Sequence, residues 1–153
     1  NPAVLPPLIL ANNQEAETWG VEWSANFQVT DWWRLRAGYT FLEEDIDATS
    51  ITVFPGSQGF EAIDPHHKVV LHSIMDLPGH FQLDTLIRYV DRLPTTAVTT
   101  QIPDYITLDV RLAWHYKQFE FSVVGQNLWD DYHAEFGTAE IPRSVYGKVT
   151  WRF

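Results

Sequence analysis

The chain has 153 residues, no Cys and a net charge of -10, from 10 Lys and Arg against 20 Asp and Glu. This length suits one domain or a piece of a larger one. The absence of Cys excludes disulfide frameworks, thiolate metal sites and Cys nucleophiles. The acidic balance opposes binding to nucleic acid, which needs a basic face.

Hydropathy leaves two classes of protein open. No apolar run approaches the roughly 18 residues of a transmembrane helix. The mean hydropathy of -0.19 fits a soluble protein. It also fits a transmembrane β-barrel, because only alternate residues of such a barrel face lipid.

The start of the chain reads as mid-chain sequence. Residues 1–16 carry three Pro and a run of Asn, Gln and Glu, which predicts a loop. No initiating Met and no charged-then-apolar leader precede it. We therefore expect a piece of a longer chain or a processed product.

From Trp19 onward, apolar and polar residues alternate, which is the period of a β-strand with one apolar face. Trp19, Val21 and Trp23 fall on one face and Gly20, Glu22 and Ser24 on the other. The same pattern recurs along the chain. It predicts strands at about 17–30, 33–44, 67–77, 81–91, 104–116, 119–129 and 144–153.

The connections between these strands alternate in length. Short turns are predicted near residues 31, 79 and 117, and long loops at 45–66, 92–103 and 130–143. Strands of 10 to 14 residues are longer than the roughly 5 or 6 that are usual in soluble domains. They match the roughly 9 to 11 tilted residues that cross a bilayer. Short turns at one end and long loops at the other are typical of outer-membrane barrels.

Aromatic residues gather at both ends of the predicted strands, as in the girdles at the two interfaces of a membrane. Near the short turns lie Trp32, Trp33, Phe81, Trp114, Tyr116, Phe119, Phe121, Trp151 and Phe153. Toward the long loops lie Trp19, Tyr39, Phe41, Tyr89 and Trp129. We expect Trp33, Trp114, Tyr116, Phe119, Trp151 and Phe153 to contact the membrane interface, and outer-membrane lipid to be a partner.

The polar face of the strands carries many charges, which a sandwich core cannot hold without a severe desolvation cost. We therefore predict an all-β antiparallel meander of about seven long strands whose charged face lines a wet lumen. Sheet edges cannot stay unpaired in hydrocarbon, so further strands are expected upstream. A soluble lipocalin-like binding barrel is the alternative. It would turn the apolar residues inward, so the direction of the two faces separates the hypotheses.

Several short fragments, taken together in their order, resemble the C-terminal barrel of TonB-dependent outer-membrane receptors. These fragments are Trp19-Gly20-Val21-Glu22, Arg36-Ala37-Gly38-Tyr39-Thr40-Phe41, Asp64-Pro65-His66-His67-Lys68, Tyr105-Ile106-Thr107-Leu108-Asp109-Val110-Arg111, Val124-Gly125-Gln126-Asn127-Leu128-Trp129-Asp130, Ile141-Pro142-Arg143 and Trp151-Arg152-Phe153.

The resemblance implies a 22-stranded barrel plugged by an N-terminal domain, with residues 1–153 as a single C-terminal segment that lacks the plug and the earlier strands. It implies TonB-dependent uptake of a scarce ligand, such as a ferric siderophore, across the outer membrane of a Gram-negative cell. A terminal Phe like Phe153 resembles the signal read by the barrel-assembly machinery. The short turns would be periplasmic and the long loops extracellular.

Candidate binding residues are few. Tyr132, His133 and Phe136 would lie at the outer mouth, where aromatic residues of this family often contact ligand. Arg88 and Arg111 could bind an anionic ligand or the plug, although a solvated lumen wall balanced by Asp84, Asp109 and Glu120 is the better explanation of them. His66 and His67 point apart on an extended chain and chelate poorly. We expect no metal, no cofactor and no enzyme activity, because no hydrolase triad, phosphate loop or HExxH pattern is present.

Overall fold

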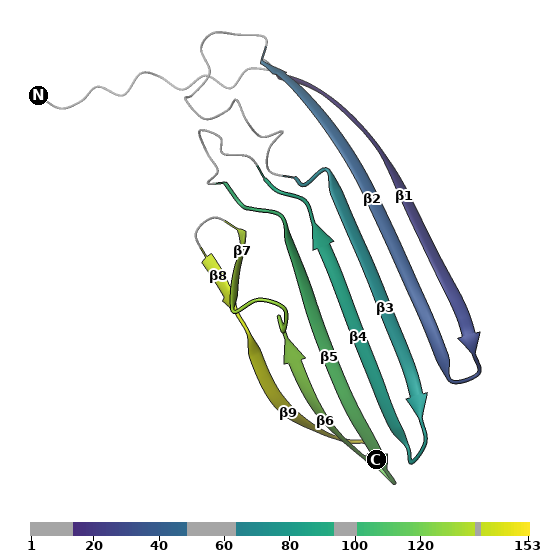
Figure 1. The fold of residues 1–153 in the computed structure, drawn as a ribbon. Coiled ribbons are helices and arrows are strands. Elements are labelled where there is room, and N and C mark those ends of the chain that lie inside the picture. The colour runs from purple at the N-terminus through teal and green to yellow at the C-terminus, as the bar shows by residue number, and fades with distance from the viewer. Residues whose placement is uncertain (1–13, 49–63, 94–100, 137–138) are drawn as a thin grey trace, which may run out of the picture.

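The computed structural model describes residues 14–48, 64–93, 101–136 and 139–153. Its main element is an antiparallel sheet of seven strands in the order β1-β2-β3-β4-β5-β6-β9, and a separate hairpin, β7-β8, lies beside it (Figure 1). The strands are β1 (Gln14–Thr30), β2 (Trp33–Ala48), β3 (His67–Leu77), β4 (Phe81–Val90), β5 (Tyr105–Tyr116), β6 (Phe119–Gln126), β7 (Tyr132–Phe136), β8 (Ala139–Pro142) and β9 (Ser144–Trp151). The predicted all-β antiparallel meander of seven long strands is confirmed.

The first two strands are longer than the pattern indicated. β1 and β2 stay paired from Gln28 and Arg34 up to Gln14 and Ala48. The prediction ended β2 near residue 44 because the alternation there gives way to acidic residues. Pairing with β1 continues all the same, because each strand supplies the other with hydrogen-bond partners. The two long connections that follow β2 and β4 lie in large part outside the described residues.

The sixth strand is shorter than predicted and ends at Gln126 instead of near 129. Asn127 takes a left-handed backbone conformation with φ of 52°, which turns the chain out of the strand. Leu128 then folds back onto Gly125, where an added Cβ would meet the Leu128 side chain at 2.9 Å. The Leu128 amide still donates to the Leu108 carbonyl at 2.8 Å, so the chain remains attached to β5.

The segment 130–143 was expected to be only a loop, and the structure shows that it holds a hairpin. Tyr132 pairs with Pro142 and His133 pairs with Ile141, with a register shift between Ala134 and Phe136. Five residues are too few for period two to stand out from the sequence. This hairpin stands at the long-loop end of the sheet, beside the upper part of β5 (Figure 1).

The register places the two residue sets on opposite faces through the whole sheet. Leu71 of β3 lies between Ala37 and Ile87, whereas its neighbour His72 lies between Arg36 and Leu86. Three residues interrupt the pattern in β3, as the sequence indicated. Val70 and Ile74 lie on the charged face, and Ser73 lies on the apolar face. The Trp33 indole Nε1 donates a hydrogen bond to the Ser73 hydroxyl at 2.9 Å, which satisfies that polar group.

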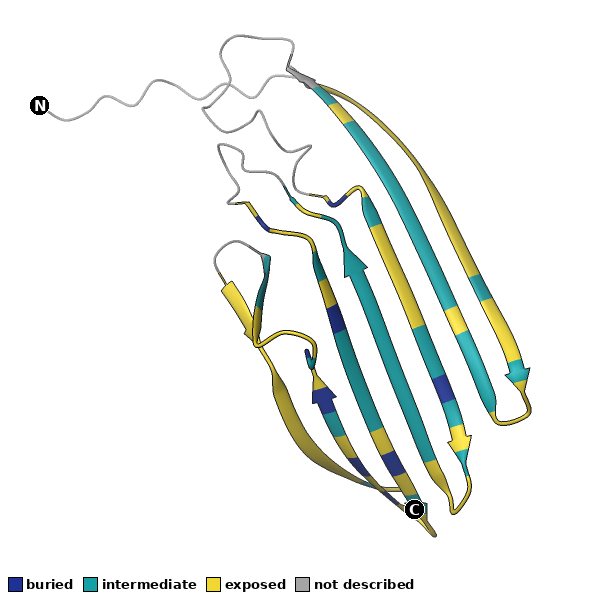
Figure 2. Cartoon of the chain, viewed as in Figure 1, coloured by how far each residue is buried: buried dark blue, intermediate teal, exposed yellow. Residues whose placement is uncertain are grey.

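Very little of the apolar surface is buried within the chain (Figure 2). Among the described residues, the buried apolar side chains are Ile74, Ile102 and Ala113. Large side chains of the apolar face are exposed instead, including Leu112 at 45%, Val123 at 58% and Val149 at 63%. Soluble monomers rarely expose a contiguous apolar patch of more than a few hundred Å². This face therefore needs an apolar partner outside the described chain.

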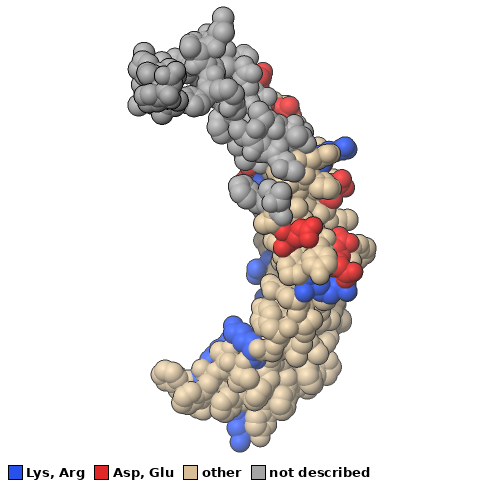
Figure 3. All heavy atoms as spheres, turned by 90° about the vertical axis from the view of Figure 1, so that its left-hand side faces the viewer, with Lys and Arg blue, Asp and Glu red and all other residues tan. Residues whose placement is uncertain are grey.

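Seen nearly edge-on, the sheet is a bowed slab rather than a flat ribbon (Figure 3). The acidic residues visible in that view gather on its upper half. A search of the described segments for helices that are long and apolar enough to cross a membrane found none.

Two glycines of the β1–β2 pair provide a matched test of how closely these strands are packed. A Cβ added at Gly20 would press against the carbonyl oxygen of Phe41, a backbone atom that cannot move alone. A Cβ added at Gly38 would lie 3.9 Å from its nearest neighbour, the Trp23 carbonyl oxygen. We expect Gly20→Ala to lower the free energy of unfolding by about 1–2 kcal/mol. Gly38→Ala should change it by less than about 0.5 kcal/mol.

Urea titration of the full-length protein in detergent micelles measures this difference. Heat-dependent mobility on a denaturing gel checks that each variant is folded before the titration. Equal midpoints for the two variants would show that β1 and β2 do not approach each other as closely at Gly20 as described.

Candidate functional site

Aromatic rings form a continuous row across four strands near the short turns. Ring-centroid distances of 5.4 to 6.4 Å join consecutive members of this row. Its members are Phe81 of β4, Trp114 and Tyr116 of β5, Phe119 and Phe121 of β6, Trp151 of β9 and, beyond the last strand, Phe153. Trp33 stands apart from this row and stacks on Trp32, with 6.2 Å between the ring centroids. All but one of the residues predicted to lie at an interface therefore share one row.

A second aromatic group closes the apolar face at the other end of the first three strands. The Trp19 ring lies 5.0 Å from Phe41, which lies 5.2 Å from the His67 ring. The Tyr39 hydroxyl shares a hydrogen bond of 2.9 Å with His67 Nδ1. Beyond Phe41 the same face turns acidic, because Glu43 follows on β2 opposite Trp19. The apolar band thus ends at this second group.

The height of the band fits a bilayer. Ile106 and Tyr116 lie on the apolar face near the two ends of β5. The ten steps between them span about 33 Å at about 3.3 Å per residue. A strand tilt of about 40° reduces this to roughly 25 Å, the height of the apolar band of outer-membrane barrels. Within the described strands, no Asp, Glu, Lys or Arg lies on this face between the two aromatic groups.

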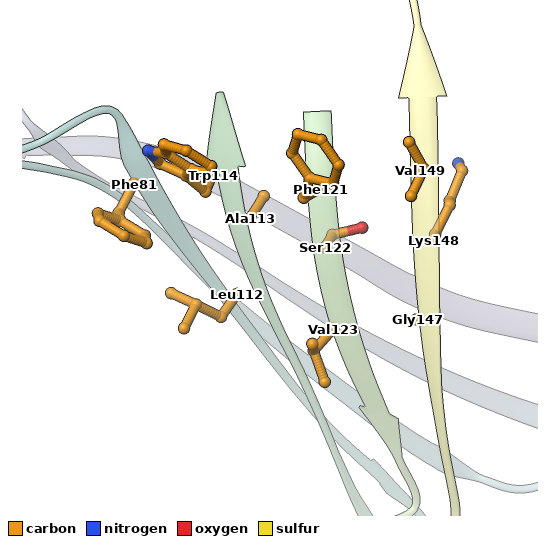
Figure 4. A pocket seen from close by; sticks show the side chains of 10 residues that line it. All are labelled: Phe81, Leu112, Ala113, Trp114, Phe121, Ser122, Val123, Gly147, Lys148 and Val149. Atoms are coloured by element: carbon orange, nitrogen blue, oxygen red, sulfur yellow. The ribbon is translucent and has the colours of Figure 1, made fainter. Parts of the chain in front are cut away.

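A shallow apolar groove of about 300 Å³ crosses this face over β4, β5, β6 and β9. Gly147 leaves the gap in β9, and Phe81, Trp114 and Phe121 form the rim. Figure 4 shows that Leu112 and Val123 point to the opposite side of their strands from Ser122 and Lys148. The groove is therefore part of the apolar face and not an entrance to the polar side.

The polar face carries a network of charges centred on Arg111. This guanidinium contacts the Asp84 carboxylate and the Glu120 carboxylate at 2.5 Å each, from the two neighbouring strands. Glu120 also accepts a hydrogen bond from Arg152 at 3.2 Å, and His115 Nδ1 lies 3.8 Å away. Only 9% of the Glu120 side chain is exposed. Each charged side chain of the Arg111 network therefore lies next to a group of opposite charge.

A second polar cluster lies at the long-loop end, where the β7–β8 hairpin meets the polar face. Glu135 of the hairpin lies 3.5 Å from Arg88 Nη2 and 2.9 Å from His133 Nε2. The Arg88 Nε donates to the Thr107 hydroxyl at 3.1 Å. The His133 ring lies 4.7 Å from the Tyr105 ring. These contacts fasten the hairpin to β4 and β5.

Asn127 fastens the same hairpin from the end of β6. Its side-chain Nδ2 donates to the Ile141 carbonyl at 2.9 Å, and its backbone amide donates to the Asp109 carboxylate at 2.9 Å. The left-handed turn at Asn127 makes both bonds possible, because it directs the chain from β6 over the polar face. The hairpin is thus a fixed part of the wall at this end.

A sequence model described as TonB dependent receptor-like, beta-barrel matches residues 1–128. The chain belongs to this family of TonB-dependent receptor barrels. Its members are receptors and transporters of the outer membrane of Gram-negative bacteria, and in them the barrel works with a plug domain and with TonB. No curated protein matches the chain at a significant level.

The exposure of the two faces argues against the lipocalin-like alternative for this receptor segment. That fold needs the apolar set inside and the charged set outside. Here Val123 and Val149 are exposed, whereas Glu120 is 7% exposed and the Arg111 side chain is 26% exposed. A search of the described part of the receptor found no group of three or more His, Asp or Glu side chains arranged to hold a metal ion.

The structure brings together some of the candidate binding residues and separates others. Arg88 and His133 meet through Glu135 at the outer end. Tyr132 lies on the same hairpin with 65% of its surface exposed. The backbone of Phe136 belongs to β7, and its side chain is outside the described part. Arg111 lies in the separate network near the short turns, so it does not share a site with the others.

Sequence reasoning missed the residues that join this outer cluster, namely Glu135, Tyr105, Thr107 and Asn127. Thr107 and Asp109 were visible as members of the polar set of their strand. Asn127 was visible within a motif of the resemblance, although no role was assigned to it. No local sequence pattern indicated a role for Glu135, because its contact with Arg88 joins residues that are 47 positions apart.

Proposed function

We propose that this chain is the C-terminal barrel segment of a receptor that takes up a scarce ligand, such as a ferric siderophore, in a TonB-dependent way. The observation that carries the proposal is the two-faced sheet. An exposed, uncharged apolar face ends at aromatic groups, and the opposite face carries the charged side chains, among them the ion-paired network of Arg111, Asp84 and Glu120. In this proposal the apolar face contacts outer-membrane lipid and the charged face contacts water and the plug domain.

The proposal also assigns each end of the sheet to one side of the outer membrane. The short turns lie on the periplasmic side and the β7–β8 hairpin lies on the outer side. Arg88, Tyr132, His133 and Phe136 are then ligand-contacting candidates at the outer mouth, and Arg111 is a contact of the plug. The last strand, with Phe153 after it, is the segment that the assembly machinery would read.

Uptake by the full-length receptor tests this proposal. A strain that lacks its other iron receptors would be given a panel of ferric hydroxamate and ferric catecholate siderophores labelled with radioactive iron. We expect accumulation of at least one of them, and loss of that accumulation when TonB is deleted. Accumulation that does not depend on TonB, or no accumulation of any ferric siderophore in the panel, would contradict the proposal.

Tyr132 provides the test of the outer mouth. Because its side chain is exposed on the hairpin, Tyr132→Ala should leave the fold intact. It should weaken binding of the transported siderophore by about tenfold, the usual effect of removing an aromatic contact from a binding site. His80→Ala, in the short turn between β3 and β4, is the control and should bind normally. If both variants bind the siderophore equally well, Tyr132 does not contact the ligand.

A further inference from the structure

The shallow groove over β4, β5, β6 and β9 is lined by two lines of cross-strand neighbours (Figure 4). The line nearer the short turns consists of Phe81, Trp114, Phe121 and Val149, which the register places side by side. The next line, toward the middle of the sheet, includes Leu112, Val123 and Gly147. Because Gly147 has no side chain, this second line has a gap at β9, and the groove opens there.

The lining of the groove matches a hydrocarbon chain. Its aromatic members are exposed, with Phe81 at 41%, Trp114 at 38% and Phe121 at 40%. Ser122 and Lys148 belong to the same strands, but their side chains point to the opposite side (Figure 4). A methylene group is about as large as a water molecule, which takes about 30 Å³ in the liquid. The groove of about 300 Å³ therefore has room for about ten methylene groups.

A cation lies at the short-turn end of the same face. Lys117 follows β5 in the turn to β6, and its Nζ lies 5.3 Å from the centroid of the Tyr116 ring. Tyr116 belongs to the aromatic row on the apolar face, so the ammonium group lies beside that face. Lys117 comes three residues after Trp114, which is about 10 Å along an extended chain. This is the distance between the rim of the groove and a charged group nearer the end of the sheet.

The charges around Lys117 favour an anion. Lys117 forms no ion pair with an Asp or Glu in the described ranges. The acidic residues of the described parts of β4, β5, β6 and β9 all lie on the polar face. In the edge-on view, Lys and Arg side chains but no Asp or Glu are visible over the lower end of the sheet, where the short turns lie (Figure 3). An anionic group beside Lys117 would therefore meet no like charge from these strands on the apolar face.

From these observations we propose that the groove and Lys117 together bind one anionic phospholipid. An acyl chain lies in the groove, and the phosphate lies at the Lys117 ammonium group. The Trp114 and Tyr116 rings lie between the two, at the level of the membrane interface that such rings prefer. This inference rests on the proposed function for the position of the sheet in the outer membrane, and deepens it by assigning a lipid class to one place on the wall.

Native mass spectrometry of the full-length receptor tests the lipid class. The receptor is released from lipid discs that contain equal amounts of phosphatidylglycerol and phosphatidylethanolamine with the same acyl chains. Phosphatidylglycerol carries a net negative charge and phosphatidylethanolamine carries none. We expect the receptor to retain phosphatidylglycerol at least about fivefold more than phosphatidylethanolamine, the effect of one Lys beside an anionic lipid.

Gly147→Leu tests the groove, because the new side chain fills the gap in β9. A Cβ at Gly147 would lie 3.9 Å from its nearest neighbour, the Ser122 carbonyl oxygen, so the backbone need not move. We expect this variant to retain at least about fivefold less phosphatidylglycerol than the parent. Val145→Leu is the matched control and should retain as much as the parent, because Val145 lies on the same face of β9 but outside the groove.

Lys117→Gln tests the charge. It removes the ammonium group from an exposed turn and keeps a side chain of similar length. The preference for phosphatidylglycerol should fall below about twofold, and the amount of phosphatidylethanolamine retained should not change. Lys68→Gln removes a Lys from the polar face of β3 and should leave the preference as it is in the parent. This variant pair keeps the proposal testable even if Gly147→Leu does not fold.

Three results would overturn the proposal. They are equal retention of the two lipids by the parent, unchanged retention of phosphatidylglycerol by folded Gly147→Leu, and receptor dimers that Gly147→Leu abolishes, since a second copy would then occupy the groove. Siderophore uptake separates this inference from the proposed function. Equal retention of the two lipids by a receptor with intact TonB-dependent uptake rejects the lipid site alone, whereas selective retention without uptake of any siderophore rejects the proposed transport alone.

Discussion

Leu71→Lys is expected to lower the free energy of unfolding by about 2–4 kcal/mol, the cost of a charge at the middle of the lipid-facing surface of a barrel. Leu71 lies at the centre of β3, between Ala37 and Ile87 on the apolar face, and is 39% exposed. On a solvated surface the same substitution would change stability by less than about 0.5 kcal/mol. The size of the effect therefore reports the medium on this face.

His72→Lys is the control, because it places the same ammonium group one residue further along at the same depth but on the opposite face. Its neighbours across the strands are Arg36 and Leu86. The like charge of Arg36 makes a small cost reasonable, below about 1 kcal/mol. Urea titration of the full-length receptor in lipid vesicles measures both variants. If the two substitutions have equal effects, the two faces see the same medium and the membrane assignment is wrong.

Arg111→Met is expected to lower the free energy of unfolding by about 2–3 kcal/mol. The substitution keeps the length of the side chain but leaves Asp84 and Glu120 without the cation that joins them. Breaking a fully buried ion pair costs about 3–5 kcal/mol. The cost should be lower here, because 21% of the Asp84 side chain is exposed and water on this face screens the charge.

Arg152→Met is the matched control for Arg111, since both side chains contact Glu120. The Arg152 side chain is 72% exposed, so its ion pair should contribute less than about 1 kcal/mol. Urea midpoints of the full-length receptor, measured side by side, test the difference. A loss for Arg152→Met as large as that for Arg111→Met would mean that burial does not set the strength of this network.

Most of the fold could be predicted because the alternation of apolar and polar residues in a strand is visible within a short stretch of sequence. Trp19 to Val29 alternate over eleven consecutive residues, and neighbours on the strand decide the face without knowledge of the partner strand. Strand ends were less predictable. The end of β6 depends on the conformation of Asn127 and on the packing of Leu128 against Gly125, and neither follows from hydropathy.

The site was predictable only in part, for a related reason. Arg88 and His133 were selected as single residues, but what brings them together is Glu135 on a five-residue strand without a clear period. The position of that strand depends on Asn127 and Ile141, which are in contact only after folding. Arg111 was chosen for its charge, and only the register shows that two carboxylates flank it.

The direction of the two faces of β3 is the central claim, and spin labels measure it most directly. The chain has no Cys, so single Cys residues can be introduced at positions 68 to 76 of the receptor and labelled in lipid vesicles. Oxygen, which concentrates in hydrocarbon, should accelerate the spin relaxation of labels at Val69, Leu71 and Met75 most strongly. A water-soluble nickel chelate should instead reach labels at Lys68 and His72. The opposite phase, or no alternation along β3, would contradict the account.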